Sequence, residues 1–315
     1  MKVVVAGANG LIGKHLVAKL RARGDEVVAL VRKTGSDGWA QGSTVVAWDG
    51  KTQGPWAAHV DGADAVVNLA GAPVAGKRWS PEWKKVIYDS RIDSTRAVVD
   101  ALKAAAKKPA VFIGGSAIGY YGLPGEAVID ETSAAGADFL AGVCRDWEAE
   151  ASKAEQAGVR TVLLRTGVVL ASDGGALEQM LPPFKAFVGG PIGDGKQWLS
   201  WIHIADEVGL ILWAIGDARV KGPLNAVAPE PVRMGTFTKA LGRALHRPSW
   251  LPVPGFALRA ALGEFATMLL GSQRVVPKVA LEGHYEFRFP QLPEALSDLF
   301  GGSRAGKPSP SEARP

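Results

Sequence analysis

The sequence predicts an α/β protein with a Rossmann-like, doubly wound parallel sheet and a small, mostly helical C-terminal substrate lobe. Two observations predict the sheet. Residues 2–33 contain a strand, a helix and a strand in succession, and apolar runs then alternate with helical segments as far as residue 170. Such alternation is typical of parallel sheets covered by helices on both faces. The lobe is predicted because residues 231–300 have a helical pattern interrupted by prolines.

The first strand–helix–strand unit is visible in its apolar spacing. Residues 3–5 are all valine, which suits a strand buried on both faces. Leu16, Val17 and Leu20 recur at helical spacing. Residues 27–31 then form a second apolar run, so the unit predicts two parallel strands with a right-handed crossover between them.

A glycine-rich loop joins the first strand to the first helix. Gly7, Gly10 and Gly13 give the spacing G-x-x-G-x-x-G. Glycine at these points allows a sharp turn, a close approach of backbone to a pyrophosphate, and packing of the helix on the strand. The free N–H groups of the helix N-terminus favour phosphate. We therefore predict a dinucleotide site whose loop residues are Gly7, Ala8, Asn9, Gly10, Leu11, Ile12 and Gly13.

The residues that end the second strand indicate which dinucleotide binds. NAD-selective sites place an acidic side chain there to accept hydrogen bonds from the ribose 2′-hydroxyl. This chain has Arg32 and Lys33 instead. A cation cannot accept those bonds but pairs well with a 2′-phosphate, so the sequence favours NADP(H).

Later strand ends add candidate cofactor contacts. Asp49 follows the third apolar run and is placed to accept from the adenine amino group. Leu69, Ala70 and Gly71 follow the fourth and would bring small-residue backbone past the ribose. The runs after the second strand that we expect to form strands are 43–49, 63–71, 109–117, 159–170 and 223–229.

Three regions are expected along the chain. Residues 1–230 form the NADP-binding domain, and its Gly- and Pro-rich stretch at about 171–200 is expected to be a substrate-lobe insertion of loops that wall a site. Residues 231–300 form the lobe. Residues 301–315 have almost no apolar content and are expected to be disordered.

Composition excludes several other classes of protein. The net charge is +5 over 315 residues with no clustered basic run, so we expect no nucleic-acid partner. No apolar stretch is long enough to cross a membrane, and no membrane partner is expected. A single cysteine, Cys144, rules out an internal disulfide and favours a cytoplasmic location. The five histidines lack ligand spacing, so no metal site is expected.

At this point the chain resembles the extended short-chain dehydrogenase/reductase superfamily. The matching segments are "GANGLIG", "NLAG", "SAIGYYG" and "WIHIAD", in the family's order over about residues 1–230. The segments "GAPVAGKRWSPEWKKVIYDSRIDSTR" and "DFLAGVCRDWE" resemble an atypical, epimerase-like branch with an extra C-terminal domain. Some members of that branch carry a cell-division-inhibitor label. This closer resemblance extends to about residue 300.

The resemblance implies proton chemistry that this chain lacks. The superfamily uses a Tyr-x-x-x-Lys pair, in which the tyrosine moves a proton while the lysine binds the nicotinamide ribose. The matching positions hold Phe139 and Val143. None of the four tyrosines is followed by lysine at that spacing. The usual Ser/Thr position falls on Ala117, with Ser116 one residue earlier, and Arg91 stands where an asparagine is common.

Several residues are left as candidates for the chemistry. Ser116, Tyr120 and His203 are candidate catalytic residues, and each has a structural alternative. Ser116 would only cap local backbone, Tyr120 would only pack in the wall of the site, and His203 would be a buried structural histidine. Arg91, Ser116 and Arg165 are further candidate contacts of cofactor or substrate. Tyr121 is expected to pack in the core, and Cys144 to be a small buried apolar side chain.

The function expected is an NADP(H)-binding oxidoreductase or epimerase-like activity on an unidentified small molecule. One alternative is a non-catalytic NADP(H) sensor, which the missing pair favours. Another is a nucleotide-sugar epimerase, which the resemblance allows. Two long helices near 80–106 and 138–157 would form a homodimer contact, or would only cover the sheet.

Overall fold

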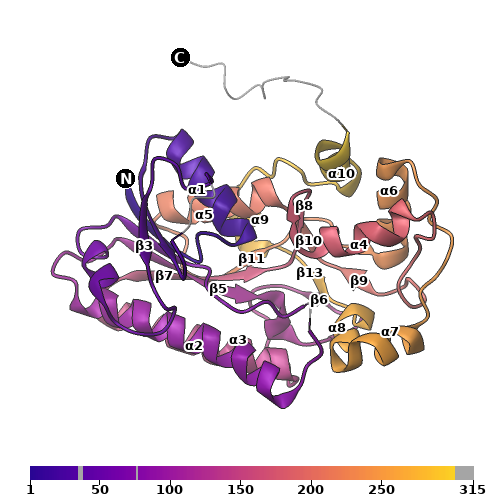
Figure 1. Ribbon diagram of the computed structural model, residues 1–315, viewed down its shortest axis with the longest axis horizontal. Coiled ribbons are helices and arrows are strands. Elements are labelled where there is room, and N and C mark those ends of the chain that lie inside the picture. The colour runs from indigo at the N-terminus through magenta and orange to yellow at the C-terminus, as the bar shows by residue number, and fades with distance from the viewer. Residues whose placement is uncertain (35–37, 76, 302–315) are drawn as a thin grey trace.

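The computed structural model describes residues 1–34, 38–75 and 77–301. At its centre is a seven-stranded sheet in the order β11-β7-β5-β4-β1-β2-β3, with every neighbouring pair parallel (Figure 1). Its strands are β1 Lys2–Ala6, β2 Glu26–Val31, β3 Thr44–Ala47, β4 Ala65–Asn68, β5 Val111–Ala117, β7 Arg160–Thr166 and β11 Gly222–Ala226. This is the Rossmann-like, doubly wound sheet that the sequence predicts.

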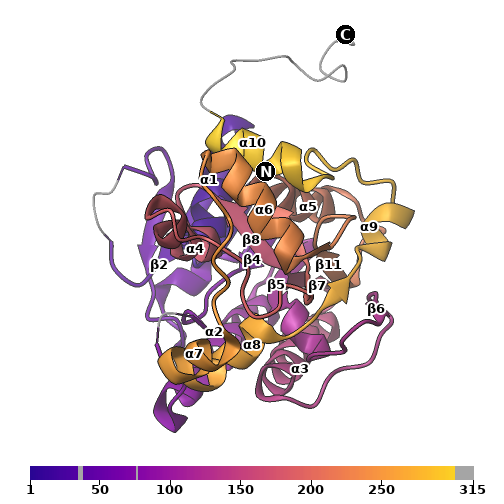
Figure 2. The ribbon, with the colours of Figure 1, turned by 90° about the vertical axis from the view of Figure 1, so that its right-hand side faces the viewer.

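Helices cover both faces of the sheet. α1 (Leu11–Ala22) and α5 (Ile204–Gly216) pack together on one face. α2 (Pro81–Ala104) and α3 (Phe139–Ser152) pack together on the other (Figures 1 and 2). The arrangement follows from the period of two along each strand, because successive side chains point to opposite faces. In β1, for example, Val3 and Val5 join the apolar cluster under α1 and α5.

The ends of the two long helices have local causes. α2 begins after Ser80 because the Ser80 hydroxyl accepts a hydrogen bond from the Trp83 N–H at 3.2 Å. α3 begins after Asp138, whose carboxylate accepts from the Ala141 N–H at 2.9 Å. α3 ends at Ser152, earlier than the predicted residue 157, and a short 3₁₀ turn follows.

The prediction of one strand over 159–170 is wrong. β7 ends at Thr166, and β8 (Val168–Ala171) leaves the sheet to pair with β10 (Trp201–His203). The break lies at Gly167, where an added Cβ would lie 2.7 Å from a Val227 methyl and 2.8 Å from the Ser200 carbonyl oxygen. The chain turns there because only glycine fits between those neighbours.

The expectation that 171–200 consists of loops is wrong in part. Residues Gly175–Lys185 form helix α4 although Pro182 and Pro183 lie inside it. Each proline removes one backbone donor, leaving the carbonyls of Glu178 and Gln179 without their helical partners. Both of those residues are exposed, so water can bond the carbonyls.

The C-terminal region is helical, as predicted. Its helices are α6 Met234–Leu245, α7 Gly255–Leu262, α8 Ala266–Leu270, α9 Lys278–Glu282 and α10 Leu292–Phe300. Two short strands accompany them and pair with earlier segments: β12 (Val232–Arg233) with β9 (Trp198–Leu199), and β13 (Arg274–Val275) with β6 (Val128–Ile129). α6 and α10 pack on each other (Figure 2). Apart from Gly301, the tail predicted to be disordered lies outside the described residues.

Two buried carboxylates fasten the C-terminal region to the sheet domain. Asp206 in α5 accepts from the N–H groups of Arg288 at 2.7 Å and Phe289 at 2.9 Å. Glu131 accepts from the N–H groups of Lys278 at 3.1 Å and Val279 at 3.3 Å. Burial raises the pKa of both carboxyl groups. The region is therefore tied to the sheet domain through its backbone.

Candidate functional site

The site lies where the strand order reverses. β1 is flanked by β2 and β4, so a crevice opens beyond the carboxyl ends of the strands, where doubly wound sheets bind ligands. The glycine loop after β1, the segment after β4 and the start of α4 meet there. They enclose a first cavity of about 360 Å³, lined by Gly7, Gly10, Leu11, Ile12, Gly13, Leu69, Gly167, Val168, Val169, Gly175 and Ala176.

The glycine loop has the tight geometry that its spacing predicts. Gly7 has φ +74°, and an added Cβ would lie 2.8 Å from the backbone of Leu69. At Gly13 an added Cβ would lie 2.3 Å from the Gly7 carbonyl oxygen. α1 begins directly after Gly10 with no side chain on its capping N–H groups and no acid in its first turn. Backbone donors at a helix N-terminus suit a phosphate.

The turn that precedes α4 packs over one side of the first cavity. His15 Nε2 in α1 lies 3.0 Å from an Asp173 carboxylate oxygen in the turn before α4. In the same turn, an added Cβ on Gly175 would lie 2.8 Å from the Leu11 side chain. The turn therefore packs directly on the first turn of α1.

A second cavity of about 550 Å³ adjoins the first and shares Gly7, Gly10 and Leu69 with it. Its other lining residues are Asn9, Leu30, Val31, Arg32, Trp48, Asp49, Gly50, Lys51, Ala70, Gly71, Ala72, Val86, Asp89, Ser90 and Asp93. Because the two cavities share residues, they form one elongated trough over the ends of β1, β2 and β4. An elongated trough of this kind suits a dinucleotide better than a compact ligand.

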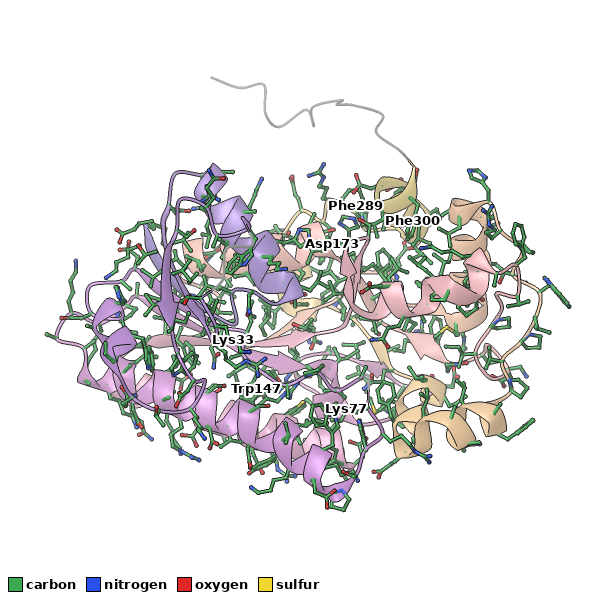
Figure 3. The ribbon with its side chains drawn as sticks, viewed as in Figure 1. Lys33, Lys77, Trp147, Asp173, Phe289 and Phe300 are labelled. Atoms are coloured by element: carbon green, nitrogen blue, oxygen red, sulfur yellow. The ribbon has the colours of Figure 1, made fainter. Side chains whose placement is uncertain are left out.

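Most of the predicted cofactor residues lie together in this trough. Arg32 lines the second cavity, and Lys33 lies next to it, near the middle of the view in Figure 3, but does not line the cavity. Asp49 lines it too, but its carboxylate already accepts from the Thr52 hydroxyl at 2.6 Å and from two backbone N–H groups. The Thr52 hydroxyl, chiefly, lowers the pKa of Asp49. Ala8 is buried beneath the loop.

The position where the superfamily has its tyrosine lies in an aromatic cluster. Phe139, the first residue of α3, packs edge-on against Trp79 with ring centroids 5.4 Å apart. The Lys84 ammonium lies 4.9 Å from the Phe139 ring and pairs with Glu264. Val143, one turn further along α3, is buried. Neither side chain can move a proton.

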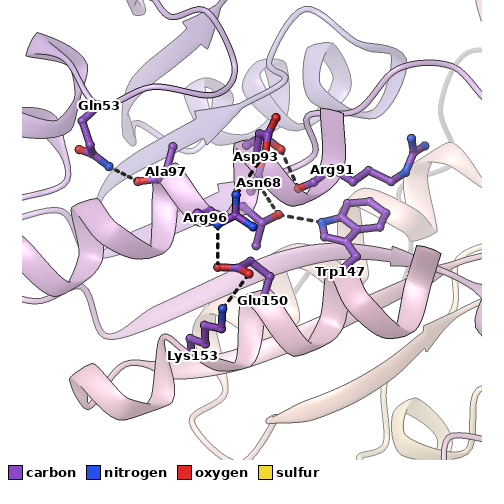
Figure 4. Close-up of polar contacts among 11 residues, drawn as sticks. Gln53, Asn68, Arg91, Asp93, Arg96, Ala97, Trp147, Glu150 and Lys153 are labelled. Carbon is purple, nitrogen blue, oxygen red and sulfur yellow. Dashed lines mark hydrogen bonds and ion pairs between the residues drawn. The ribbon is translucent and has the colours of Figure 1, made fainter. Parts of the chain in front are cut away.

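Arg91 lies between α2 and α3, next to the trough. Its Nη1 donates to the carbonyl oxygens of Ala72 at 3.1 Å and Ile87 at 2.9 Å. Its guanidinium lies 5.1 Å from the Trp147 ring (Figure 4), whose indole N–H donates to the Thr95 hydroxyl. Among the described residues no carboxylate pairs with it within 4.0 Å, and burial lowers its pKa. Arg91 is therefore a largely buried cation without a counter-charge.

Ser116 and Arg165 bind the same buried carboxylate, a contact that no short-range sequence pattern predicts. The Ser116 hydroxyl donates to Glu148 Oε1 at 2.6 Å. Arg165 donates to both Glu148 oxygens at 2.8 Å. Arg165 lines neither cavity and its guanidinium is engaged with Glu148, and its contact with the cofactor stays a prediction.

The two neighbouring tyrosines differ. Tyr121 donates to Asn225 Oδ1 at 2.7 Å and accepts from Arg165 Nη1 at 2.8 Å, and burial raises its pKa to about 12. Tyr121 is therefore a core residue, as expected. Tyr120 is half-buried with its ring 3.6 Å from the Arg165 guanidinium, and its hydroxyl has no hydrogen-bond partner among the described residues.

His203 serves as a helix cap. Its Nδ1 accepts from the Ala205 N–H at the start of α5, and its ring packs on Phe289 at 4.0 Å. Burial lowers its pKa to about 4. In the described structure His203 lines neither cavity.

Glu207 is a buried acid that sequence reasoning missed. It lies in the first turn of α5 and is fully buried, and it accepts from the Thr166 hydroxyl at 2.8 Å. Its second oxygen has no partner among the described residues. Burial raises its pKa to about 8. An acidic residue in a helix's first turn looks like an ordinary dipole partner in sequence, so no local signal distinguished it.

Two other kinds of site are absent from the described part of the chain. No group of three or more His, Cys, Asp or Glu side chains there could hold a metal ion. No helix among these residues is long and apolar enough to cross a membrane. Cys144 is buried, and burial raises the pKa of its thiol to about 12.

The sheet order, the glycine loop and the trough define a Rossmann-type nucleotide-binding protein. The chain belongs to the NAD dependent epimerase/dehydratase family, whose model matches residues 3–226. Residues 253–299 match a domain of unknown function, DUF1731. The resemblance to an epimerase-like branch with an extra C-terminal domain is thereby confirmed.

Relatives extend over nearly the whole chain. The Arabidopsis thaliana "Epimerase family protein SDR39U1 homolog, chloroplastic" is 46% identical over 299 residues, covering 94% of this chain and 86% of its own. The human epimerase family protein SDR39U1, crystallised with NADPH, has a TM-score of 0.87 and 34% identity, covering 96% of this chain and all of its own. A nucleoside-diphosphate sugar epimerase from Corynebacterium glutamicum, 34% identical with a TM-score of 0.75, covers 96% of this chain and 58% of its own.

Proposed function

We propose that this protein is an NADP(H)-dependent reductase of a small carbonyl compound. The trough carries the proposal: two adjoining cavities over the reversal point of the sheet, with Arg32 lining the second. The NADPH bound to the human relative supports the choice of cofactor.

The residues of the trough fit the parts of the cofactor. The glycine loop and the first turn of α1 would hold the diphosphate, and Arg32 would pair with the 2′-phosphate. The backbone of Leu69–Gly71 would run alongside the ribose. When bound, the nicotinamide supplies a hydride, and hydride transfer needs little more than two reactants held at the right distance and angle.

The proton is the harder requirement, because Phe139 has none to give. Among the three candidates, the Ser116 hydroxyl donates to Glu148, and the Nδ1 of His203 caps a helix. Tyr120 lines neither cavity either, but its hydroxyl has no partner among the described residues. We therefore favour Tyr120 or a water molecule as the proton donor. A reductase needs one such proton, whereas an epimerase must remove and return it, so the missing pair favours reduction over epimerisation.

Two alternatives have their own support. The absent tyrosine and lysine favour a non-catalytic NADP(H) sensor. The Corynebacterium glutamicum relative supports a nucleoside-diphosphate sugar epimerase. If the protein is a reductase or an epimerase, its expected partner is a small molecule. Nucleic acid is not an expected partner under any of the three proposals.

The test is loss of NADPH absorbance with a panel of aldehydes and ketones, alongside a panel of nucleotide sugars assayed for epimerisation. Turnover of a carbonyl compound that falls in Tyr120→Phe supports the reductase. Tyr121→Phe is the matched control for general disturbance of the tyrosine pair. Tight NADPH binding without turnover of any compound supports the sensor, and epimerisation of a nucleotide sugar would replace the proposal.

A further inference from the structure

The outer end of the C-terminal region carries a surface that is unusually apolar. We call it the tip surface and define it by five exposed side chains. They make up five of the ten large apolar side chains exposed in the described structure, and are Phe187, Val188, Trp250, Leu251 and Phe256. Trp250 is 64% exposed and Phe256 75%. Phe187 and Val188 follow α4, Trp250 and Leu251 lie between α6 and α7, and Phe256 is the second residue of α7. These segments face the viewer in Figure 2.

The tip surface is built by specific contacts between those two segments. Gly189 pairs with Ser249, and Ile192 with Val253, through parallel bridges. The Trp250 indole N–H donates to the Phe187 carbonyl oxygen at 3.2 Å. Phe187, Val188, Trp250 and Leu251 therefore lie on or beside two segments that are paired through their backbones.

Phe187 is held outward in an unfavourable backbone conformation. Its φ of 62° lies in the left-handed region, where a residue with a Cβ is uncommon. Its ring is exposed and lies 4.6 Å from the Arg247 guanidinium. An aromatic side chain that faces solvent in a strained backbone is consistent with a surface that binds something.

Helix α7 continues the apolar character. None of its eight residues is buried, although its sequence GFALRAAL contains one charged side chain, Arg259. Surface helices normally turn an apolar stripe to the core and polar residues outward. α7 does not follow this pattern, so part of its apolar surface is left without a partner in the single chain.

The segments that carry the tip side chains contain basic residues but no acidic ones. Residues 231–263 contain no Asp or Glu, and neither do residues 179–193. The cations of these segments that have no carboxylate partner within 4.0 Å among the described residues are Lys185, Lys239, Arg243, Arg247 and Arg259. Arg233 is excluded because it pairs with Glu126.

We propose that the tip surface docks on the interface of an anionic lipid bilayer. Exposed aromatic rings suit the headgroup level of a membrane, and cations around them suit its negative charge. A second copy of this chain is disfavoured because it would bring the same positive charges face to face. The tip surface would lie on the bilayer without crossing it. The expectation of no membrane partner, drawn from the sequence, rested only on the absence of a segment long enough to cross a membrane.

The proposal is independent of the reductase. None of the five tip side chains lines either cavity, so changes there should leave cofactor binding intact. This separation gives the experiment an internal check on folding.

The test is co-sedimentation of the full chain with phosphatidylcholine vesicles, with and without phosphatidylserine. We expect binding that needs phosphatidylserine and that weakens at least about tenfold in Trp250→Ser with Phe256→Ser. The control, Val128→Ser with Leu281→Ser, removes exposed apolar side chains elsewhere. A charge variant, Lys239→Glu with Arg243→Glu, should also weaken binding, whereas Lys103→Glu with Lys107→Glu should not.

NADPH affinity and thermal unfolding are measured for every variant, so that misfolding is recognised. No binding to either vesicle, or equal loss in tip and control variants, would overturn the proposal. A shift from dimer to monomer in the tip variants without vesicle binding would show instead that a second copy covers the surface.

Discussion

Arg165 at the end of β7 and Glu148 in α3 form a buried two-point ion pair, with Nε to Oε1 and Nη2 to Oε2 both at 2.8 Å. Ser116 at the end of β5 donates to the same carboxylate. The ends of β5 and β7 are thereby joined to α3. Ser116 and Arg165, both candidate contacts of cofactor or substrate, bind the same Glu148 carboxylate in this structure.

Breaking this pair should destabilise the fold strongly. Arg165→Met leaves the Glu148 carboxylate buried without its cation, and we expect a loss of about 3–5 kcal/mol in the free energy of unfolding. Urea denaturation measures it. Arg165→Met combined with Glu148→Gln should recover much of the loss, because neither charge is then left alone. A double variant as unstable as the sum of the two single ones would contradict this account.

Removing Arg91 should affect cofactor binding more than stability. The guanidinium is buried without a counter-charge, so Arg91→Met should change the free energy of unfolding by less than about 1 kcal/mol. It also loses the bond to the Ala72 carbonyl, which lies in the wall of the second cavity. We expect NADPH affinity to fall about tenfold, measured by titration.

The matched control for Arg91 is Arg96→Met on the same helix. Arg96 is exposed and pairs with Asp93. Its removal should leave NADPH affinity unchanged. An Arg91→Met protein that binds NADPH normally would show that this cation has no part in the site.

Restoring the missing lysine should be harmful. Val143 is buried in α3, and the neighbouring Arg91 already places one unpaired cation at the α2–α3 interface. Val143→Lys would bury a second charge without a partner, so we expect a loss of more than about 2 kcal/mol in the free energy of unfolding. Val143→Met, of similar length without charge, should be tolerated. Val143→Lys with unchanged stability would mean that the interface is far more open than described.

Glu207 should make stability depend on pH. Burial raises its pKa from 4.5 to about 8 in the folded protein, so folding favours the protonated acid. Its contribution to stability is fully present below pH 4.5 and is lost as pH rises through about 8. In Glu207→Gln the slope of unfolding free energy against pH should flatten by about one proton over this window. Glu178→Gln, at an exposed position of α4, should leave the slope unchanged.

The sheet could be predicted because the signals for its strands, apolar runs and a glycine loop, lie within short stretches of sequence. Residues 3–5 and 27–31 are buried as expected, and the glycine loop has the geometry that its spacing implies. The break at Gly167 could not be predicted, since it depends on Val227 and Ser200, which are distant in sequence. α4 was missed because Pro182 and Pro183 signal a loop, and the exposure that makes them tolerable appears only in the fold.

The cofactor half of the site could be predicted better than the chemical half. The trough is lined by strand-end backbone and by Arg32, both of which follow from position along the chain. Ser116, Arg165 and His203 have roles set by Glu148 and by the start of α5, partners that no short-range pattern reveals. Polar side chains inside a core are assigned by long-range contacts, and these decide which candidates are free to act.

The most direct test of the proposed function is the titration of the purified protein with NADPH and with NADH, followed by energy transfer from tryptophan to the nicotinamide. Trp48 lines the second cavity and provides a nearby donor. The account predicts NADPH binding at least about tenfold tighter than NADH, or about 1.4 kcal/mol, with the preference lost in Arg32→Asp. Failure to bind either cofactor, or an equal affinity for both that Arg32→Asp leaves unchanged, would contradict it.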